Sequence, residues 1–380
     1  MRPASEVERR RLGETFAELC AIASPSGREG AMAARVRADL EALGITVTED
    51  DAAAALGGES GNLLARLPGR ADRVVLLCAH LDTVPHEGPV EPVSVDGGWE
   101  SAGDTILGAD NKAAVAVLLE LARRVAIEGS PVGIELLFTV GEETALAGAK
   151  AFDTSVLRAD VGYVYDHASP IGEIVVASPT YVRFEAEFVG KAAHAGIRPQ
   201  DGRSAIVAAA RAVAAMELGR IDDDTTANVA QIRGGVPGTN VVPERCTIVG
   251  EARSLSESGV EAVVSEIIDG CYDAANDPSC ACDVDVTVER LFEGYRHRTS
   301  APQVLAAEAA LRACGYATSR ILTGGGSDAN VFEAAGLPCT NLANGTERNH
   351  EPTERVSHAA LEGMLDVTFA LLDELADQAA

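Results

Sequence analysis

The chain has 380 residues and a formal net charge of −27 at pH 7, because 58 acidic residues outnumber 31 basic ones. Hydrophobic residues make up 47% of the sequence, which is typical of a folded globular protein and excludes a largely disordered one. The acidity argues against binding to nucleic acid or to an anionic membrane surface, and we expect neither partner. We expect no membrane span and no secretory segment, because no apolar stretch is long enough to cross a bilayer and residues 1–11 are charged.

Eight cysteines are scattered along the chain, and they form no C-x-x-C motif. Cysteines in this arrangement, without a secretory segment, indicate reduced thiols and a cytoplasmic protein. Metal binding by Cys280 and Cys282 is an alternative, but their spacing differs from that of a zinc knuckle and no second pair accompanies them.

The first part of the chain alternates apolar strands with helical patterns. Continuous apolar runs at 74–79, 134–140 and 161–165 are typical of strands buried on both faces. Between the first two runs, residues 113–125 carry apolar side chains at helical spacing. We therefore predict an α/β fold with a mostly parallel sheet covered by helices.

The pattern changes near Ser178. Residues 181–189 alternate apolar and charged side chains, which predicts an antiparallel strand with one exposed face. The elements expected next, in chain order, are a helix near 203–218, a strand near 245–252, a helix near 257–275 and a strand near 282–289. Together they predict a small α+β domain.

Buried patterns return from residue 294 onward. The expected elements are a helix at 302–313, a glycine-rich loop at 324–326, a short strand at 338–342 and a C-terminal helix at 357–376. The simplest organisation is one large domain, formed by residues 1–177 and 293–380. A smaller domain, residues 178–292, is inserted into it.

Side chains of the types that bind metal ions cluster after the predicted buried strands and at the start of one helix. They are His80, Asp82, Asp110, Glu142, Glu143, Asp166 and His350. In an open parallel sheet the carboxyl ends of the strands lie along one edge, where ligands bind. We therefore expect these side chains to converge on one site.

Two histidines and four or five carboxylates suit Zn²⁺ or another borderline divalent ion. The carboxylates are too many for one four-coordinate zinc, so we expect two ions bridged by Asp110, which could activate a water molecule and polarise a carbonyl group. One of the pair Glu142 and Glu143 would be a ligand and the other a general base. Asp82 would orient His80.

Each of these residues also has a simpler interpretation. His80 alone could be a packed or surface residue, the Glu142–Glu143 pair a solvated loop, and Asp110 the N-cap of its helix. The stretch 324–329 matches G-x-G-x-x-A and could form a dinucleotide-binding turn, although too little chain follows for the rest of such a fold. The joint placement at strand ends favours the metal site.

The sequence resembles the M20 metallopeptidases, most closely their peptidase T-like, tripeptidase-like branch. The similarity runs from about residue 20 to the C-terminus. The blocks that carry it are CAHLDTVP (78–85), ILGADNKAAVA (106–116), TVGEETALAGAK (139–150), YDH (165–167), GKAAHAG (190–196), GTNVVPE (238–244), EARSL (251–255) and GGGSDANVF (324–332).

The resemblance implies a zinc-exopeptidase-like fold and a role for each site residue. His80, Asp110 and Asp166 would bind one zinc ion. Asp110, Glu143 and His350 would bind the second. Glu142 would be the general base and Asp82 would orient His80. The resemblance also implies a cis peptide bond after Asp110.

The inserted domain resembles the ferredoxin-like lid or dimerisation domain of the family, which implies a homodimer. There His194 would stabilise the oxyanion, and Asn240 and Arg253 would contact the substrate. Arg253 would bind the carboxylate group of the substrate. A cross-strand ion pair is the alternative for Arg253.

The implied enzyme hydrolyses short peptides with two Zn²⁺ ions, or with Co²⁺ or Mn²⁺, as a tripeptide aminopeptidase does. Dipeptidase, carboxypeptidase or N-acyl-amino-acid amidohydrolase activity is the alternative within the family. A non-catalytic peptide-binding protein is a more distant alternative, and the presence of Glu142 and Asp110 argues against it.

Overall fold

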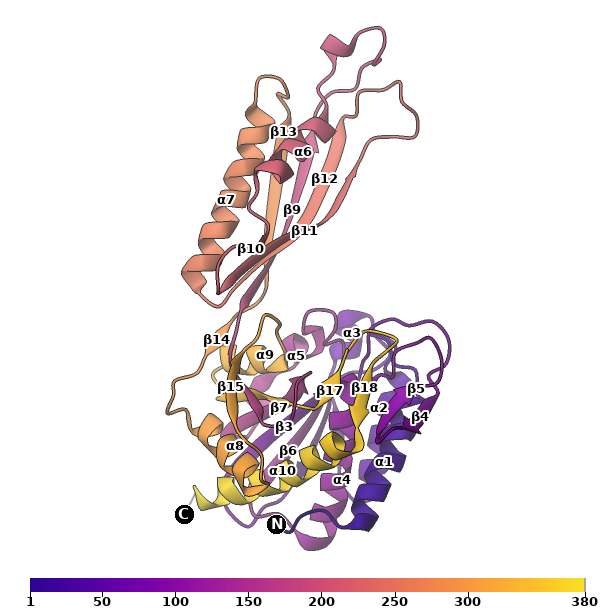
Figure 1. Ribbon diagram of the computed structural model, residues 1–380, viewed down its shortest axis with the longest axis vertical. Coiled ribbons are helices and arrows are strands. Elements are labelled where there is room, and N and C mark those ends of the chain that lie inside the picture. Colours follow the sequence, from indigo (N-terminus) through magenta and orange to yellow (C-terminus); the bar gives the residue numbers. More distant parts are fainter. Residues whose placement is uncertain (379–380) are drawn as a thin grey trace. The chain divides into compact units, whose positions relative to one another are not determined.

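The computed structural model describes residues 1–378, which divide into two compact units (Figure 1). Unit 1 comprises Met1–Val176, His297–Leu322 and the described residues from Ser327 on, and unit 2 comprises Ala177–Arg296 and Thr323–Gly326. The sequence analysis assigned the last of these segments to the large domain. It groups with unit 2 because Ser178 donates a hydrogen bond to Gly325 O, at 2.9 Å, and the Phe292 ring packs against Gly326.

Unit 1 contains a large mixed sheet with the strand order β1-β2-β6-β3-β7-β16-β8, in which β15 also pairs with β8. Its strands are β1 (Val47–Glu49), β2 (Leu63–Leu67), β3 (Val74–His80), β6 (Gly133–Thr139), β7 (Val161–His167), β8 (Glu173–Ser178), β15 (Ser319–Leu322) and β16 (Cys339–Ala343). The four central strands β6, β3, β7 and β16 are parallel. This confirms the predicted mostly parallel sheet.

Helices cover the sheet of unit 1. They are α1 (Glu6–Cys20), α2 (Gly30–Glu41), α3 (Ala52–Leu56), α4 (Ala109–Glu128), α5 (Ala147–Ala151), α8 (Pro302–Ala313), α9 (Asp328–Ala334) and α10 (His358–Asp377). Helices α1, α4, α8 and α10 pack together, whereas α9, α5 and α3 form a second group, and both α4 and α9 contact β7. Within residues 1–378, no helix has both the length and the apolarity that a membrane crossing requires.

A second, antiparallel sheet in unit 1 has no counterpart in the sequence predictions. Its order is β17-β18-β5-β4, with β4 (Pro92–Val95), β5 (Gly98–Ser101), β17 (Thr346–Glu347) and β18 (Arg355–Ser357). Strands of two to four residues give too short a pattern to be recognised in a sequence. The segment between β17 and β18 carries His350.

Unit 2 contains a five-stranded antiparallel sheet with the order β10-β11-β12-β9-β13. Its elements are β9 (Thr180–Val189), α6 (Ala205–Ala215), β10 (Gly219–Arg220), β11 (Thr225–Gly234), β12 (Arg245–Ser254), α7 (Glu257–Asn276), β13 (Asp283–Phe292) and β14 (Tyr295–Arg296), which pairs with the end of β8. The long strands and two helices give the ferredoxin-like order that the family resemblance implies. Phe184, Phe188 and Ile248 are buried in two apolar clusters to which α6 and α7 contribute, and alternate residues of β9 point away from these clusters.

Candidate metal centre

Four of the predicted site residues lie where the central parallel strands of unit 1 end. His80 is the last residue of β3 and is aligned with Thr139 at the end of the neighbouring strand β6. Glu142 and Glu143 follow β6, and Asp166 lies near the end of β7, on the other side of β3. Because these strands are parallel, their carboxyl ends bring all four side chains to one edge of the sheet.

Asp110, in the first turn of α4, and His350, in a loop, reach the same edge. Gly108, with φ of +72°, adopts the left-handed conformation that glycine tolerates and turns the chain into α4. The peptide bond between Asp110 and Asn111 is cis, as the resemblance implies, and both residues depart from helical backbone angles. His350 lies between β17 and β18 with φ of +67°, which is unusual for a residue other than glycine.

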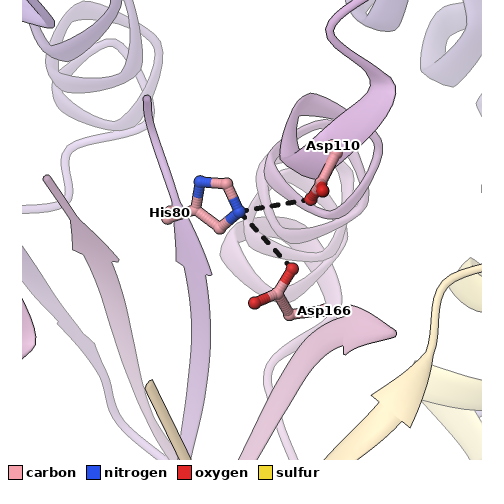
Figure 2. A group of neighbouring side chains, drawn as sticks. All are labelled: His80, Asp110 and Asp166. Carbon is pink, nitrogen blue, oxygen red and sulfur yellow. Dashed lines mark hydrogen bonds and ion pairs between the residues drawn. The ribbon is translucent and has the colours of Figure 1, made fainter. Parts of the chain in front are cut away.

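The first group of potential ligands comprises His80, Asp110 and Asp166. Figure 2 shows both carboxylates directed at one nitrogen of the imidazole ring. His80 Nε2 lies 3.2 Å from Asp110 Oδ1 and 3.4 Å from Asp166 Oδ1. Three donor atoms that face one another in this way can bind a common cation.

The second group comprises Asp110, Glu143 and His350. His350 Nε2 lies 2.8 Å from Glu143 Oε1 and 3.3 Å from Asp110 Oδ2. Asp110 therefore presents one carboxylate oxygen to each group. The side chain of His350 is 49% exposed, whereas that of Glu143 is 10% exposed, so this group is the more accessible of the two.

Opposite charges determine how these groups titrate. Burial disfavours a charged His80, but the carboxylates of Asp166 and Asp110 outweigh this and place its pKa well above the usual value. Hydrogen bonds to Asp110 and Glu143 raise the pKa of His350 to about 10. Burial raises the pKa of Asp166 to about 8, and repulsion from Asp110 adds to this effect. The carboxylates of the site therefore outnumber the two histidines that could neutralise them.

Glu142 lies beside both groups. Its carboxylate, His80 and Glu143 form a third set of side chains whose ligand atoms are close enough to bind one ion. Burial raises the pKa of Glu142 well above its usual value, and repulsion from the Asp166 carboxylate acts in the same direction. A carboxyl group with a raised pKa in this setting is suited to general acid–base chemistry.

Asp82 contacts more of the site than the sequence predicted. Its Oδ1 lies 3.3 Å from His80 Nδ1, which is the contact expected of a residue that orients the imidazole. In addition, it accepts hydrogen bonds from the backbone N–H groups of Glu142 and Glu143, at 3.0 and 3.2 Å, and from the Ser26 hydroxyl at 2.7 Å. The fully buried Asp82 therefore fixes the loop after β6 as well as the histidine.

Three further polar residues support the ligands, and the sequence analysis missed them. Asn341 exchanges two hydrogen bonds with the backbone of Asp166, Asn349 donates to Asp110 Oδ2 at 2.8 Å, and Glu354 accepts the N–H of Asp110 at 2.9 Å. Amide and carboxylate side chains that form such hydrogen bonds are common in ordinary loops, so the sequence gives no signal that separates these three.

Two predicted substrate contacts, His194 and Asn240, lie close together in unit 2. The segments that carry them are joined by a hydrogen bond from Ala195 N to Asn240 O, at 2.9 Å, and by an isolated bridge between His194 and Val241. Both side chains are exposed. His194 Nδ1 accepts a hydrogen bond from the N–H of Gly196 at 3.2 Å.

Arg253 lies elsewhere in unit 2, on β12. It forms an ion pair with Glu251, two residues away on the same strand, at 3.1 Å, so the partner is not on a neighbouring strand as the alternative interpretation supposed. Its guanidinium carbon lies 4.0 Å above the Tyr181 ring, and Nη1 donates to Gly324 O at 3.2 Å. These contacts hold the guanidinium in one orientation.

The sequence as a whole matches a known family. The family model described as peptidase family M20/M25/M40 matches residues 76–374, which is most of the chain. The chain belongs to this family. It is an M20 peptidase of the peptidase T-like branch.

Individual relatives cover nearly the full length of this M20 peptidase. An uncharacterised protein, YqjE, of Bacillus subtilis is 37% identical over 97% of this chain and all of its own length. The structure of aminopeptidase PepT from Bacillus cereus is 37% identical and has a TM-score of 0.88 over 97% of this chain and 99% of that one. A tripeptidase from Staphylococcus aureus is 34% identical and has a TM-score of 0.91 over the same shares.

The side chains at this edge of the M20 peptidase suit divalent cations. Imidazole and carboxylate donors are the ligand types that zinc and similar ions take in proteins. Repulsion among the clustered carboxylates contributes to the raised pKa values of Asp166 and Glu142, and bound cations would offset it. Glu143 Oε1 is buried and faces His350 Nε2, 2.8 Å away, within this cluster of potential ligands.

Proposed function

We propose that this M20 peptidase is a two-zinc enzyme that hydrolyses short peptides at their N-terminal end, as a tripeptide aminopeptidase does. The observation that carries the proposal is the pair of ligand groups that share Asp110. The similarity to an aminopeptidase and to a tripeptidase, each aligned over nearly the whole chain, supports the substrate class.

One ion would be held by His80, Asp110 and Asp166, and the other by Asp110, Glu143 and His350. Zn²⁺ suits these donors, and Co²⁺ or Mn²⁺ are alternatives. Bound ions would lower the pKa of a water molecule and polarise the carbonyl group of the scissile amide.

In the proposed reaction, Glu142 takes the proton of the attacking water and then delivers it to the nitrogen of the leaving amine. The position of Glu142 beside His80 and Glu143 supports this role, because it places the carboxylate at both ligand groups. Asp82 would keep both the base and the imidazole in place, through the N–H of Glu142 and through Nδ1 of His80.

Unit 2 would bind the peptide. We assign His194 to the stabilisation of negative charge on the carbonyl oxygen, and Asn240 and Arg253 to substrate binding. Arg253 uses three of its five N–H groups on Glu251 and Gly324, which leaves two for a substrate carboxylate. We further propose that unit 2 is the lid and supplies the surface of a homodimer.

The test is a substrate screen of the purified full chain. The protein is stripped of metal with a chelator and reloaded with Zn²⁺, Co²⁺ or Mn²⁺, and release of amino acids is measured. Tripeptides with a free N-terminus should be cleaved faster than dipeptides, N-blocked peptides or N-acyl amino acids, and only after reloading. Preferred hydrolysis of N-acyl amino acids would instead assign the chain to the amidohydrolases of the family.

A further inference from the structure

Glu354 is a buried carboxylate with an unusual set of partners. It is 1% exposed and lies four residues after His350, immediately before β18. Its Oε2 accepts the backbone N–H of Gly108 at 2.7 Å, and its Oε1 accepts that of Asp110 at 2.9 Å. Both oxygens therefore bind one short loop, more than 200 residues away in the sequence.

That loop needs an external partner. The first N–H groups of a helix have no acceptor within the helix and are usually satisfied by a side chain just before it. The residue before α4 is Gly108, which has no side chain to offer. Glu354 supplies the acceptor instead, and its negative charge is favourable at the start of a helix.

Glu354 belongs to the segment that carries His350, so it connects this segment to the loop of Asp110. The His350 side chain is 49% exposed, so the backbone of its segment contributes to fixing its position beside Asp110 and Glu143. A hydrogen bond from Glu354 N to Glu351 O, at 3.0 Å, and one from Arg348 Nε to Thr353 O, at 2.9 Å, make residues 348–354 a tight turn. Glu354 anchors this turn to the loop of Asp110.

We propose that Glu354 is a positioning residue that sets the distance between His350 and Asp110 and thereby the affinity for the ion that these two residues bind together with Glu143. The inference rests on the proposed function, because it takes His350 and Asp110 to be ligands. Glu354 itself is given no ligand role, because it lies outside the three groups of potential ligands. Loss of a residue that orients metal ligands lowers metal affinity about 10–100-fold.

The experiment compares wild-type protein with the variant Glu354→Gln. The amide has the same shape but only one acceptor oxygen, so it cannot accept both N–H groups. Zn²⁺ is titrated into the ion-free full chain by calorimetry, and the visible spectrum is recorded with Co²⁺. Wild-type protein should bind two ions. In Glu354→Gln one of the two affinities should fall about 10–100-fold, with a changed Co²⁺ spectrum.

Glu135→Gln is the matched control. Glu135 is also 1% exposed; its Oε2 accepts two backbone N–H groups, those of Arg158 and Ala159, at 2.8 and 3.0 Å, and its Oε1 accepts Nε of Arg66 at 2.7 Å. It lies near the start of β6, at the opposite end of the strand from the metal centre. The control should lower the melting temperature of the ion-free protein and leave both ion affinities unchanged.

Glu354→Asp provides a second measurement if the glutamine variant does not fold. The shorter carboxylate keeps the charge but cannot reach both N–H groups, so its ion affinity should lie between those of wild type and Glu354→Gln. Wild-type affinity in either Glu354 variant, or an equal loss of affinity in Glu135→Gln, overturns the role of Glu354. Fewer than two ions in the wild-type protein itself overturns the proposed function, and this inference with it.

Discussion

The metal centre of unit 1 and the His194 segment of unit 2 are built in opposite ways. His80 and Asp82 are almost fully buried, and each is held by several side-chain contacts. His194 and Asn240 are exposed, and backbone hydrogen bonds alone join their segments. Under the proposed function, ion binding would therefore be a property of the folded unit 1, whereas the exposed residues of unit 2 would gain partners only when a substrate is present.

The largest effect that this comparison predicts is on catalysis by Glu142. In Glu142→Ala the ligands that hold the ions stay in place, but no carboxylate remains to transfer the proton. We expect turnover to fall by about 10²–10⁴-fold, while metal analysis still finds two ions per chain. Turnover close to that of wild type would show that another residue is the base.

The second prediction concerns the exposed segment. His194→Ala should lower kcat by about 10²–10³-fold and leave KM almost unchanged, because stabilisation of the oxyanion acts in the transition state. Ion affinity should not change. Lys191→Ala, an exposed neighbour in the same segment, is the control and should leave both constants unchanged. An effect confined to KM would assign His194 to ground-state binding instead.

The sequence predicted the part of the site that depends on regular structure. The apolar runs that became β3, β6 and β7 located His80, Glu142, Glu143 and Asp166 at one sheet edge, since a buried parallel sheet fixes where its strands end. For His350 the only structural argument was that it follows the strand predicted at 338–342. Its position depends on the small sheet that contains β17 and β18, whose strands are too short for a recognisable pattern.

The sequence analysis also missed β11 (Thr225–Gly234) in unit 2. Most of this strand is exposed and polar, so it lacks the alternation that revealed β9. Nine of its ten residues are paired with β12 along the backbone, with an irregularity between Val229 and Gln231, and no side-chain pattern reports such pairing. The same reason explains why Glu354 was missed, because its partners are backbone N–H groups.

A third prediction tests whether the contacts around Arg253 hold its guanidinium in an orientation that binds a substrate carboxylate. In Arg253→Met the KM for tripeptides with a free C-terminal carboxylate should rise about 10-fold or more, since a hydrogen bond to a charged group contributes roughly 1.5–3 kcal/mol. Peptides with an amidated C-terminus should be little affected. Arg183→Met is the control, because Arg183 forms a similar ion pair with Glu185 on the adjacent strand. Equal changes in both variants would contradict a specific role for Arg253.

The smallest effect on activity is expected for a buried ion pair of unit 1 outside the metal centre. Arg124, 2% exposed, donates to both carboxylate oxygens of Glu8, at 2.7 and 2.6 Å, and lies over the Phe369 ring. Burial alone would raise the pKa of Glu8, but hydrogen bonds from Arg124 and Ser5 outweigh it and hold the pKa well below its usual range. The pair therefore stabilises the folded chain whenever Glu8 is ionised.

Because the pKa is lowered on folding, the contribution of Glu8 is complete above the pKa of about 4.3 that glutamate has in an unfolded chain, and it is lost as the pH falls further. Glu8→Gln should lower the free energy of unfolding at pH 7 by roughly 1–3 kcal/mol and should weaken its dependence on pH below about 5. Urea unfolding at pH 7 and at pH 3 measures both effects. Ion affinity and kcat should match wild type at pH 7, because α1 and its partner Arg124 contribute none of the ligands. A loss of ion affinity in this variant would show that the metal centre depends on contacts elsewhere in unit 1.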